Sequence, residues 1–362
     1  MTGLLHKPND VVGNRYEVID YIGEGGMQEV YSARDHLLNR MIALKSPKGA
    51  SARKRFQRSA VVSAKVNHPN IAKTLDYFDE GDRQYLVEEL VEGCNLAEFL
   101  RDHVPALDPY SVAMIFHRLA QGLRASHHVN VAHRDMKPSN VMVQGGKDFL
   151  NVKITDFGIA KLAEAEIGEA AEGGGDSLTA SATALGALPY MAPEMIDDFK
   201  SAGKPADVWA LGAMTFELLT GKKPFGDGYR AVKAIEAGVL PPLPQEIIGN
   251  TQFRNLIGEI MDLVQKCIIK DISLRISSDE LASLCSQLCY SDAKRHFGVV
   301  STLDYEKYGF IQPENGLPVF YHRNSTYNMP NLAVGTKVWY SHFPGTPRNR
   351  AFPVVAARQR QP

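Results

Sequence analysis

Residues 133–140 of the chain carry side chains that suit chemistry at a phosphate group. They read His-Arg-Asp-Met-Lys-Pro-Ser-Asn and follow an apolar segment with helical spacing. Asp135 can orient and deprotonate a hydroxyl group, and Lys137 can neutralise negative charge that develops on a phosphate. This run therefore predicts a site that activates a hydroxyl group for attack on phosphorus.

Two further side chains fit a divalent metal ion at the same site. Asn140 ends the run just described, and Asp156 stands in the sequence Ile-Thr-Asp-Phe-Gly at the end of a β-like run. Amide and carboxylate oxygens are hard ligands of the kind that Mg²⁺ prefers. The pair predicts a magnesium site close to Asp135.

A glycine-rich run near the N-terminus is a candidate phosphate-binding loop. Residues 22–30 read Ile-Gly-Glu-Gly-Gly-Met-Gln-Glu-Val after a β-like run. Closely spaced glycines let backbone N–H groups approach phosphate oxygens, although a tight turn between two strands explains the run equally well. Lys45 ends the apolar run 42–45, where a lysine is usually a surface residue with its stem on apolar neighbours. Neither feature defines a site alone.

The elements that position these residues fall into three regions. A β-rich region comes first, and it is interrupted by a segment with helical spacing at 53–66. A helical region follows, and it contains an Ala/Glu/Gly/Ser-rich stretch at 163–182 that predicts a flexible loop. From about residue 291, short β-like runs alternate with Gly and Pro turns. The expected strands are 16–22, 29–33, 41–45 and 85–89, and the expected helices are 109–126, 206–219, 251–268 and 278–289.

Composition excludes several classes of protein. The 362 residues are 44% apolar and 22% charged, which is ordinary for globular domains and excludes disordered, collagen-like and disulfide-scaffold chains. The sequence has no run of 18 uncharged apolar residues, so it predicts no membrane span. The four cysteines form no CxxC pair, and we therefore expect a cytoplasmic protein. From Ser291 onward the sequence contains nine Lys or Arg residues and only four acidic residues. This excess fits either an anion-binding module or a basic domain without such a ligand.

Five motifs in order resemble the protein kinases, and specifically the bacterial Ser/Thr kinases of eukaryotic type. They are the glycine-rich run, Ala-x-Lys at 43–45, the runs at 133–140 and 154–158, and Ala-Pro-Glu at 192–194. The resemblance implies an α+β fold over residues 13–290, with a β-rich N-lobe and a helical C-lobe. It implies that ATP and Mg²⁺ bind between the lobes and that protein Ser/Thr hydroxyl groups are the acceptors.

The resemblance also assigns roles to individual residues. The catalytic residues are Asp135, Lys137 and Lys45, and the metal ligands are Asn140 and Asp156. The nucleotide-binding residues are Ile22, Gly23, Glu24, Gly25, Gly26, Met27, Gln28, Glu29, Val30, Ala43, Lys45, Glu89, Val91 and Met142. It further implies an ion pair between Glu194 and Arg275.

The partner of Lys45 departs from the family pattern. Ser59 stands where the helix of the N-lobe should carry the glutamate that pairs with this lysine, and residues 46–75 contain no acid at all. Glu88 stands one residue before the hinge, where the family has an apolar residue. We therefore hypothesise that Glu88 pairs with Lys45 in place of the missing glutamate. The alternatives are that Glu88 turns to solvent or is protonated.

Three other features affect activity and its control. Gln28 replaces the third loop glycine, and its side chain either crowds the phosphates or points to solvent. Ala187 replaces a threonine that normally touches the catalytic aspartate. An ATP-binding pseudokinase scaffold is therefore the alternative to a working kinase. Arg134 resembles an arginine that pairs with phosphate on the loop between residues 158 and 192, where the candidate phosphosites are Ser177, Thr179, Ser181 and Thr183.

Residues 294–358 resemble a cold-shock domain, which is a five-stranded OB-like barrel. The first strand lacks the tryptophan of that family. The resemblance implies an aromatic surface on which bases of single-stranded RNA or DNA stack, with nucleic acid as a possible regulator. The alternative is that the rings pack inside the barrel or dock on the preceding domain. The candidate residues are Tyr308, Phe310, Phe320 and His322.

Overall fold

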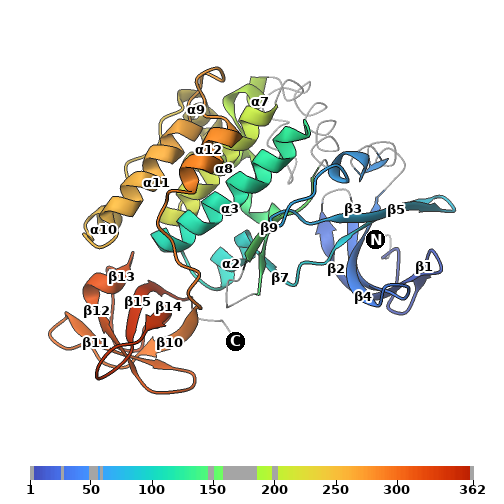
Figure 1. The fold of residues 1–362 in the computed structure, drawn as a ribbon. Coiled ribbons are helices and arrows are strands. Elements are labelled where there is room, and N and C mark those ends of the chain that lie inside the picture. Colours follow the sequence, from blue (N-terminus) through green and yellow to red (C-terminus); the bar gives the residue numbers. More distant parts are fainter. Residues whose placement is uncertain are drawn as a thin grey trace.

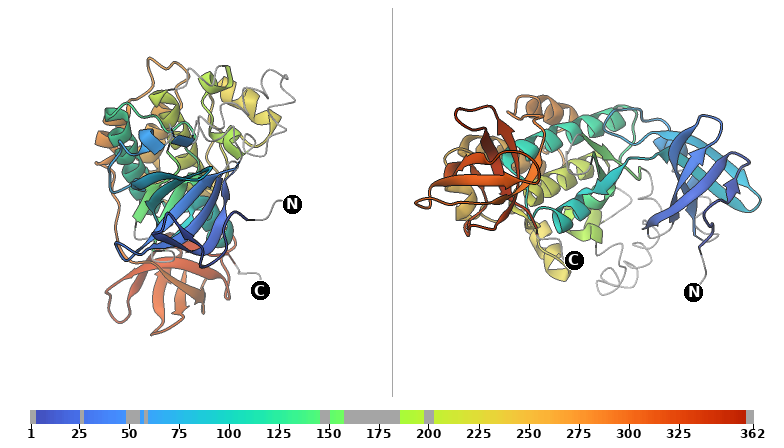
Figure 2. Two further views of the ribbon diagram at one scale, coloured as in Figure 1. Left: turned by 90° about the vertical axis from the view of Figure 1, so that its right-hand side faces the viewer. Right: turned by 90° about the horizontal axis from the view of Figure 1, so that it is seen from below.

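The computed structural model describes residues 4–25, 28–48, 56–57, 60–145, 151–157, 186–197 and 203–358. It contains an N-terminal lobe built on a β-sheet, a larger helical lobe and a C-terminal β-barrel, as the sequence predicts (Figure 1). The N-terminal lobe and the barrel lie against different sides of the helical lobe (Figure 2). Within the described ranges, no helix is long and apolar enough to cross a membrane.

The N-terminal lobe is a six-stranded antiparallel sheet in the order β1-β2-β3-β4-β6-β5. The four strands that the sequence predicts all lie within it. Tyr31, Ile42, Leu44 and Tyr85 pack on one face as a core of this lobe alone. The strands are β1 (Val11–Val12), β2 (Tyr16–Gly25), β3 (Gln28–Asp35), β4 (Arg40–Pro47), β5 (Thr74–Glu80) and β6 (Arg83–Glu89).

The register of β4 and β6 brings Lys45 and Glu88 to the same face of the sheet. Lys45 is opposite Leu86, and Ala43 is opposite Glu88. Directly opposed residues point to the same side, and residues two apart on one strand do so as well. The two charged side chains are therefore diagonal neighbours on the face that looks toward the helical lobe.

A helical stretch packs on that face, as the sequence predicts. Residues 56–57 and 60–63 are helical. Phe56 and Ala60 are buried against Leu86 of β6, which fixes the helix to the sheet through apolar contacts. Ser59 lies outside the described residues.

The helical lobe is centred on two long helices, α3 and α8, and it includes a small sheet of three strands. Asp108 caps α3 by accepting hydrogen bonds from the N–H groups of Tyr110 and Ser111, and Pro109 occupies the first turn, where it is tolerated. The helices are α2 (Leu96–Asp102), α3 (Pro109–His128), α7 (Pro193–Asp197), α8 (Lys204–Thr220), α9 (Tyr229–Ala237), α10 (Gln245–Ile248), α11 (Arg254–Cys267) and α12 (Ser278–Cys285). The strands are β7 (Gly93–Asn95), β8 (Val141–Gln144) and β9 (Asn151–Ile154).

Two predicted helix boundaries are wrong by three residues or more. The helix expected at 251–268 begins at Arg254, because the side chain of Asn250 accepts from Gln252 N and holds a turn before it. The helix expected at 278–289 ends at Cys285. Beyond that point Leu288 turns into the core, whereas Cys289 is exposed.

The C-terminal region forms the closed five-stranded barrel that the sequence predicts. Strands β10, β11 and β12 form an antiparallel meander, β14 pairs with both β10 and β15, and β12 closes the barrel by a parallel bridge from Phe320 to Arg350. Ile311, Tyr321 and Tyr340 are in its interior. The strands are β10 (His296–Val300), β11 (Tyr308–Pro313), β12 (Val319–His322), β14 (Lys337–Phe343) and β15 (Arg350–Ala356), with the short β13 (Thr326–Tyr327) beside β15.

The barrel and the helical lobe share one hydrophobic core. Trp339 of β14 is fully buried and meets Phe99 of α2 edge to face, with 5.6 Å between the ring centroids. Phe352 of β15 stacks on Phe253 at 5.5 Å. The hydroxyl group of Tyr327 donates to the carbonyl oxygen of Leu219, 2.7 Å away. The barrel is therefore an integral part of the packing and not a tethered appendage.

A buried ion pair lies at the centre of this interface. Arg295, only 6% exposed, donates from Nη2 to Asp108 Oδ2 and to Ser111 Oγ, both at 2.7 Å. Its guanidinium group lies 4.6 Å from the ring centroid of Trp339. Asp108 thus caps α3 and neutralises a charge that the barrel brings.

Because of this pair, we expect Arg295→Met to lower the free energy of unfolding by about 3 to 5 kcal/mol, since the substitution leaves the Asp108 carboxylate buried without its charge partner. Urea unfolding of the full chain measures the loss. Arg101→Met is the matched control, because Arg101 pairs with Asp102 at the surface and contributes little. Equal stability of the two variants would contradict a structural role for Arg295.

Candidate active site

The site lies where the N-terminal sheet faces the helical lobe, and Lys45 is at its centre. Lys45 Nζ lies 2.5 Å from Glu88 Oε2 and 2.7 Å from Asp156 Oδ1. Lys45 is 5% exposed and Glu88 is 4% exposed. The pairing of Lys45 with Glu88 that the sequence predicts is therefore present, and the alternative in which Glu88 turns to solvent is wrong.

The charges of these three groups adjust to their burial. Burial alone would lower the pKa of Lys45, but Asp156 and Glu88 together raise it, so the ammonium group stays charged. Burial raises the pKa of Glu88, and the attraction of Lys45 offsets only part of that effect. Burial also acts to raise the pKa of Asp156, yet the charge of Lys45 holds it below its usual value. As pH falls, Glu88 therefore takes up a proton before Asp156 does.

Gln28 at the start of β3 points into the site. Its Nε2 donates to Asp156 Oδ1 at 3.1 Å, and the side chain is only 3% exposed. Its Oε1 is buried without a hydrogen-bond partner. The alternative in which Gln28 points to solvent is therefore wrong. Gly26 and Met27, which precede it in the turn, lie outside the described residues.

Asp135, Lys137 and Asn140 form a second cluster beside the first. Lys137 Nζ is 2.8 Å from Asp135 Oδ2. Asn140 Nδ2 donates to both the backbone oxygen and Oδ2 of Asp135, at 2.7 and 2.9 Å. Because the amide nitrogen is used in this way, the amide oxygen of Asn140 is left to accept from a ligand. Thr155 N donates to Asn140 O at 2.9 Å, which ties this cluster to the strand end that carries Asp156.

Asp207 at the start of α8 holds the loop that carries Asp135. Its Oδ2 accepts from His133 N at 2.8 Å, and its Oδ1 accepts from Arg134 N at 2.6 Å. Arg134 has a φ of 65°, a left-handed conformation that side chains seldom adopt, and these two bonds support it. The sequence predicts no role for Asp207, although an acid in the first turn of a buried apolar helix was an available signal.

Other predicted nucleotide-binding residues line the sheet side of the site. Val30 is opposite Lys45, and the buried Ala43 is opposite Glu88. The Glu29 side chain instead accepts from Leu5 N at 3.0 Å and from the Tyr31 hydroxyl group, so only its backbone is available. The rest are placed on named elements: Ile22, Gly23, Glu24 and Gly25 in β2, Glu89 at the end of β6, Val91 just beyond it, and Met142 in β8.

Two predicted features of the helical lobe have clear outcomes. The ion pair of Glu194 with Arg275 is present as two parallel bonds of 2.6 and 3.0 Å. Ala187 is buried in the apolar core, so no hydroxyl group is present at that position. The candidate phosphosites and the predicted flexible loop lie outside the described residues.

The residues present fit a magnesium ion. Asn140 and Asp156 supply one amide and one carboxylate oxygen, and Gln28 Oε1 is a buried oxygen without a partner beside Asp156. Mg²⁺ is usually held by one or two protein carboxylates and completes its shell with phosphate oxygens and water. Within the described part of the chain, no cluster of three or more His, Cys, Asp or Glu side chains has metal-binding geometry.

The barrel carries a separate strip of rings on its outer surface. Tyr308 is opposite His322 and Phe310 is opposite Phe320 in the β11–β12 register, so all four share one face. Phe320 lies 6.0 Å from both Tyr308 and Phe310, measured between ring centroids. None of the four is fully buried, so the alternative in which they pack inside the barrel is wrong. We call these four residues the aromatic strip.

Comparison with known proteins supports the arrangement. Residues 16–286 match the family model described as "Protein kinase domain". The chain is 34% identical over 226 residues to the serine/threonine-protein kinase PrkC of Bacillus subtilis (strain 168), which covers 61% of the chain and 32% of PrkC. It is 33% identical over 277 residues to the probable serine/threonine-protein kinase PknB of Lactococcus lactis subsp. lactis (strain IL1403), which covers 75% of the chain and 41% of PknB.

The chain thus spans less than half the length of each of these two bacterial relatives. A crystal structure of Rad53 1-466 in complex with AMP-PNP matches with a TM-score of 0.56 and 23% identity, over 74% of the chain and 64% of that structure's chain. At this identity the likeness shows the fold alone.

We expect Asp207→Asn to loosen the loop at Asp135, because an amide cannot accept from both His133 N and Arg134 N. Hydrogen bonds to a charged group contribute about 1.5 to 3 kcal/mol, so amide exchange at these residues should quicken by roughly ten- to a hundredfold. Hydrogen exchange read by mass spectrometry measures it. Asp279→Asn, which alters an exposed partner of His128, should leave amide exchange at His133 and Arg134 unchanged. Unchanged protection in Asp207→Asn would contradict the anchoring role.

Proposed function

The chain belongs to the protein kinase domain family, and we propose on this premise that it transfers the γ-phosphoryl group of ATP to Ser or Thr hydroxyl groups of proteins. One observation carries the proposal: Lys45 Nζ of the N-terminal lobe lies 2.7 Å from Asp156 Oδ1 of the helical lobe. This contact brings the phosphate-binding and metal-binding sides together beside Asp135. We place the activity in the cytoplasm, where ATP is available and thiols such as the four free cysteines stay reduced.

Each described residue of the site has a part in the proposed reaction. The acceptor hydroxyl group approaches Asp135, which orients it and takes its proton while the new oxygen–phosphorus bond forms and the bond to ADP breaks. Lys137, 2.8 Å from Asp135, neutralises charge on the phosphoryl group in transit. Lys45 contacts the two phosphate groups that remain in ADP after the transfer. Asn140 and Asp156 would hold Mg²⁺, whose chemistry is to neutralise phosphate charge.

The purine ring of ATP is expected between apolar side chains of both lobes. Ile22 lies in β2, Val30 in β3 and the buried Ala43 in β4 of the sheet, and Met142 lies in β8 of the helical lobe. The backbone at Glu89 and Val91 follows β6 and would meet the edge of the ring. The Glu89 side chain itself is engaged with Lys153 Nζ at 2.7 and 2.9 Å, so it is not offered to the nucleotide.

An ATP-binding scaffold without catalysis is the alternative, and two observations favour it. Gln28 hydrogen-bonds to Asp156, so a metal ion must compete with an amide group for that carboxylate. Ala187 provides no hydroxyl group to order Asp135 and Lys137. Against this, the sequence retains all five residues assigned to catalysis and metal binding, and the contacts of Lys45 with Asp156 and of Asp135 with Lys137 and Asn140 support catalysis.

Phosphate transfer from labelled ATP with Mg²⁺ to the protein itself and to a generic basic protein separates the two proposals. We expect transfer that disappears in Asp156→Ala, a variant that also excludes a contaminating kinase. ATP binding without any transfer would favour the scaffold instead.

We expect Glu88→Met to reduce transfer by about ten- to a hundredfold, because Lys45 then keeps only one of its two carboxylate partners and loses its fixed position. Restoring an acid at the position where the family carries it, as Ser59→Glu in the Glu88→Met background, should recover much of the loss. Glu259→Met changes an exposed glutamate of α11 and serves as the control. Full activity of Glu88→Met, or no recovery in the double variant, would contradict the exchange of partners.

The finer proposal concerns the barrel, which we infer to be a cold-shock-like module that binds single-stranded RNA or DNA and localises or regulates the kinase. The aromatic strip supports it, because neighbouring outward rings on two strands offer stacking surfaces to successive bases. Lys307 and Arg323 flank the strip in sequence and can follow a phosphate backbone.

If the strip binds nucleic acid, Phe310→Ala should weaken the affinity for a single-stranded oligonucleotide by roughly five- to a hundredfold, because a stacked base contributes about 1 to 3 kcal/mol. Fluorescence anisotropy of a labelled oligonucleotide with the full chain measures it at low salt. Phe343→Ala removes an exposed ring of β14 outside the strip and should have no effect. No binding by micromolar protein at low salt would reject this finer proposal and leave the kinase proposal intact.

A further inference from the structure

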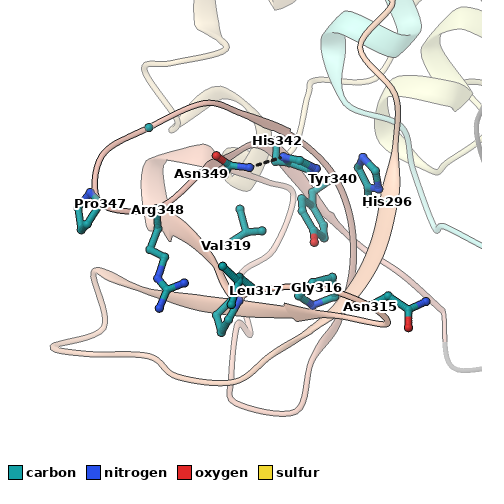
Figure 3. Close-up of a pocket in the computed structure, with 13 residues that line it drawn as sticks. His296, Asn315, Gly316, Leu317, Val319, Tyr340, His342, Pro347, Arg348 and Asn349 are labelled. Atoms are coloured by element: carbon teal, nitrogen blue, oxygen red, sulfur yellow. Dashed lines mark hydrogen bonds between the residues drawn. The ribbon is translucent and has the colours of Figure 1, made fainter.

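A pocket opens at the end of the barrel, away from both the active site and the aromatic strip. It encloses about 400 Å³, within the size range of sites for small organic ligands. The β11–β12 loop, the β14–β15 loop and the start of β10 form its walls (Figure 3). We call it the barrel-mouth pocket. None of the four residues of the aromatic strip lines it.

Tyr340 points into this pocket with a hydroxyl group that lacks a partner. The residue is fully buried in the barrel interior, with 0% of its surface exposed. Its hydroxyl oxygen is buried without a hydrogen-bond partner and is directed toward Gly316 and Leu317 at the mouth (Figure 3). A buried hydroxyl group without a partner is costly, so this position calls for a partner such as a bound molecule, an ion or an ordered water.

The groups around Tyr340 are mostly hydrogen-bond donors. Burial raises the pKa of Tyr340 to about 12, so its hydroxyl group keeps the proton it can donate. Asn349 Nδ2 lies 3.2 Å from His342 Nδ1; an amide nitrogen can only donate, so the proton of the neutral ring is on Nε2. Arg348 adds a guanidinium group at the rim, and His296 lies 4.5 Å from His342 between ring centroids.

The lining also defines what the pocket excludes. None of the described residues that form it is an aspartate or glutamate, so a cation would find no charged ligand there. Pro318, Pro347 and Leu317 supply apolar walls that suit the flat face of a ring. The donors and these walls together match a molecule that carries both a negative charge and a ring.

We propose that the barrel-mouth pocket binds a small organic phosphate of the size of a nucleoside monophosphate, with Tyr340, His342 and Arg348 donating to the phosphate and the apolar walls enclosing the ring. Free inorganic phosphate shares the charge but not the ring, and a nucleoside shares the ring but not the charge. Both are therefore informative probes.

Calorimetric titration of the full chain with each of the four common nucleoside 5′-monophosphates tests the proposal. At least one should bind with one-to-one stoichiometry through the pocket, and Tyr340→Phe should weaken it at least tenfold while leaving the melting temperature intact. Tyr308→Phe removes the same hydroxyl group from the aromatic strip and should change nothing. Arg348→Ala, at the exposed rim of the pocket, provides a second variant and should weaken the binding of the same monophosphate by a similar factor.

The arms of the experiment separate the other outcomes. Lys45→Met removes the phosphate contact of the active site, so binding that it abolishes and Tyr340→Phe spares would place the nucleotide in the active site and overturn the proposal. If inorganic phosphate binds as tightly as the monophosphate, the role of the ring is refuted. If the nucleoside binds as tightly as the monophosphate, the role of the charge is refuted. Absence of saturable binding at millimolar concentration would leave only water as the partner of Tyr340 and overturn the proposal altogether.

Discussion

The buried positive charge of Lys45 is the constraint on which the union of the two lobes depends. An ammonium group removed from water is tolerated only with charged partners at close range. The sheet supplies one of them, Glu88, through the register of β4 and β6, and the helical lobe supplies the other, Asp156. Because Glu88 belongs to the same sheet as Lys45, the lysine is oriented without any acid from the helical residues 56–57 and 60–63. The position of that helical stretch is therefore free to be set by the apolar packing of Phe56 and Ala60 on Leu86, and need not be coupled to the charge of Lys45.

The helical lobe uses the same physical device in two more places. The carboxylate of Asp207 fixes a strained loop by accepting two backbone N–H groups, and that of Glu194 is matched by both arms of Arg275. Each is a charge held by more than one hydrogen bond, which is the condition under which buried charges stabilise and position a structure.

What the sequence predicts and what it misses differ in physical kind. Motif order predicts the lobes. The absence of acids from residues 46–75, together with an acid at the normally apolar position 88, suggests Glu88 as a partner of Lys45, because a buried charge must be matched. The direction of the Gln28 side chain is left open by the sequence, because it depends on the space between the lobes, which no local pattern records. Arg295 and Tyr340 are missed for a related reason: a lone arginine before a strand and a tyrosine within one look the same whether they face solvent, another lobe or a cavity.

The shared core at Trp339 has a consequence for how the chain is made. The rings that cover Phe99 and Phe253 come from β14 and β15, near the end of the sequence, and the carboxylate that caps α3 meets its charge partner only at Arg295. The ribosome synthesises the helical lobe before the barrel. The surface of this lobe at Phe99 and Phe253 cannot be buried until the barrel strands have emerged. The junction near residues 290–294 thus separates two architectures, but it does not separate two units that fold independently. The helical lobe becomes complete only when the last strand of the barrel has been synthesised.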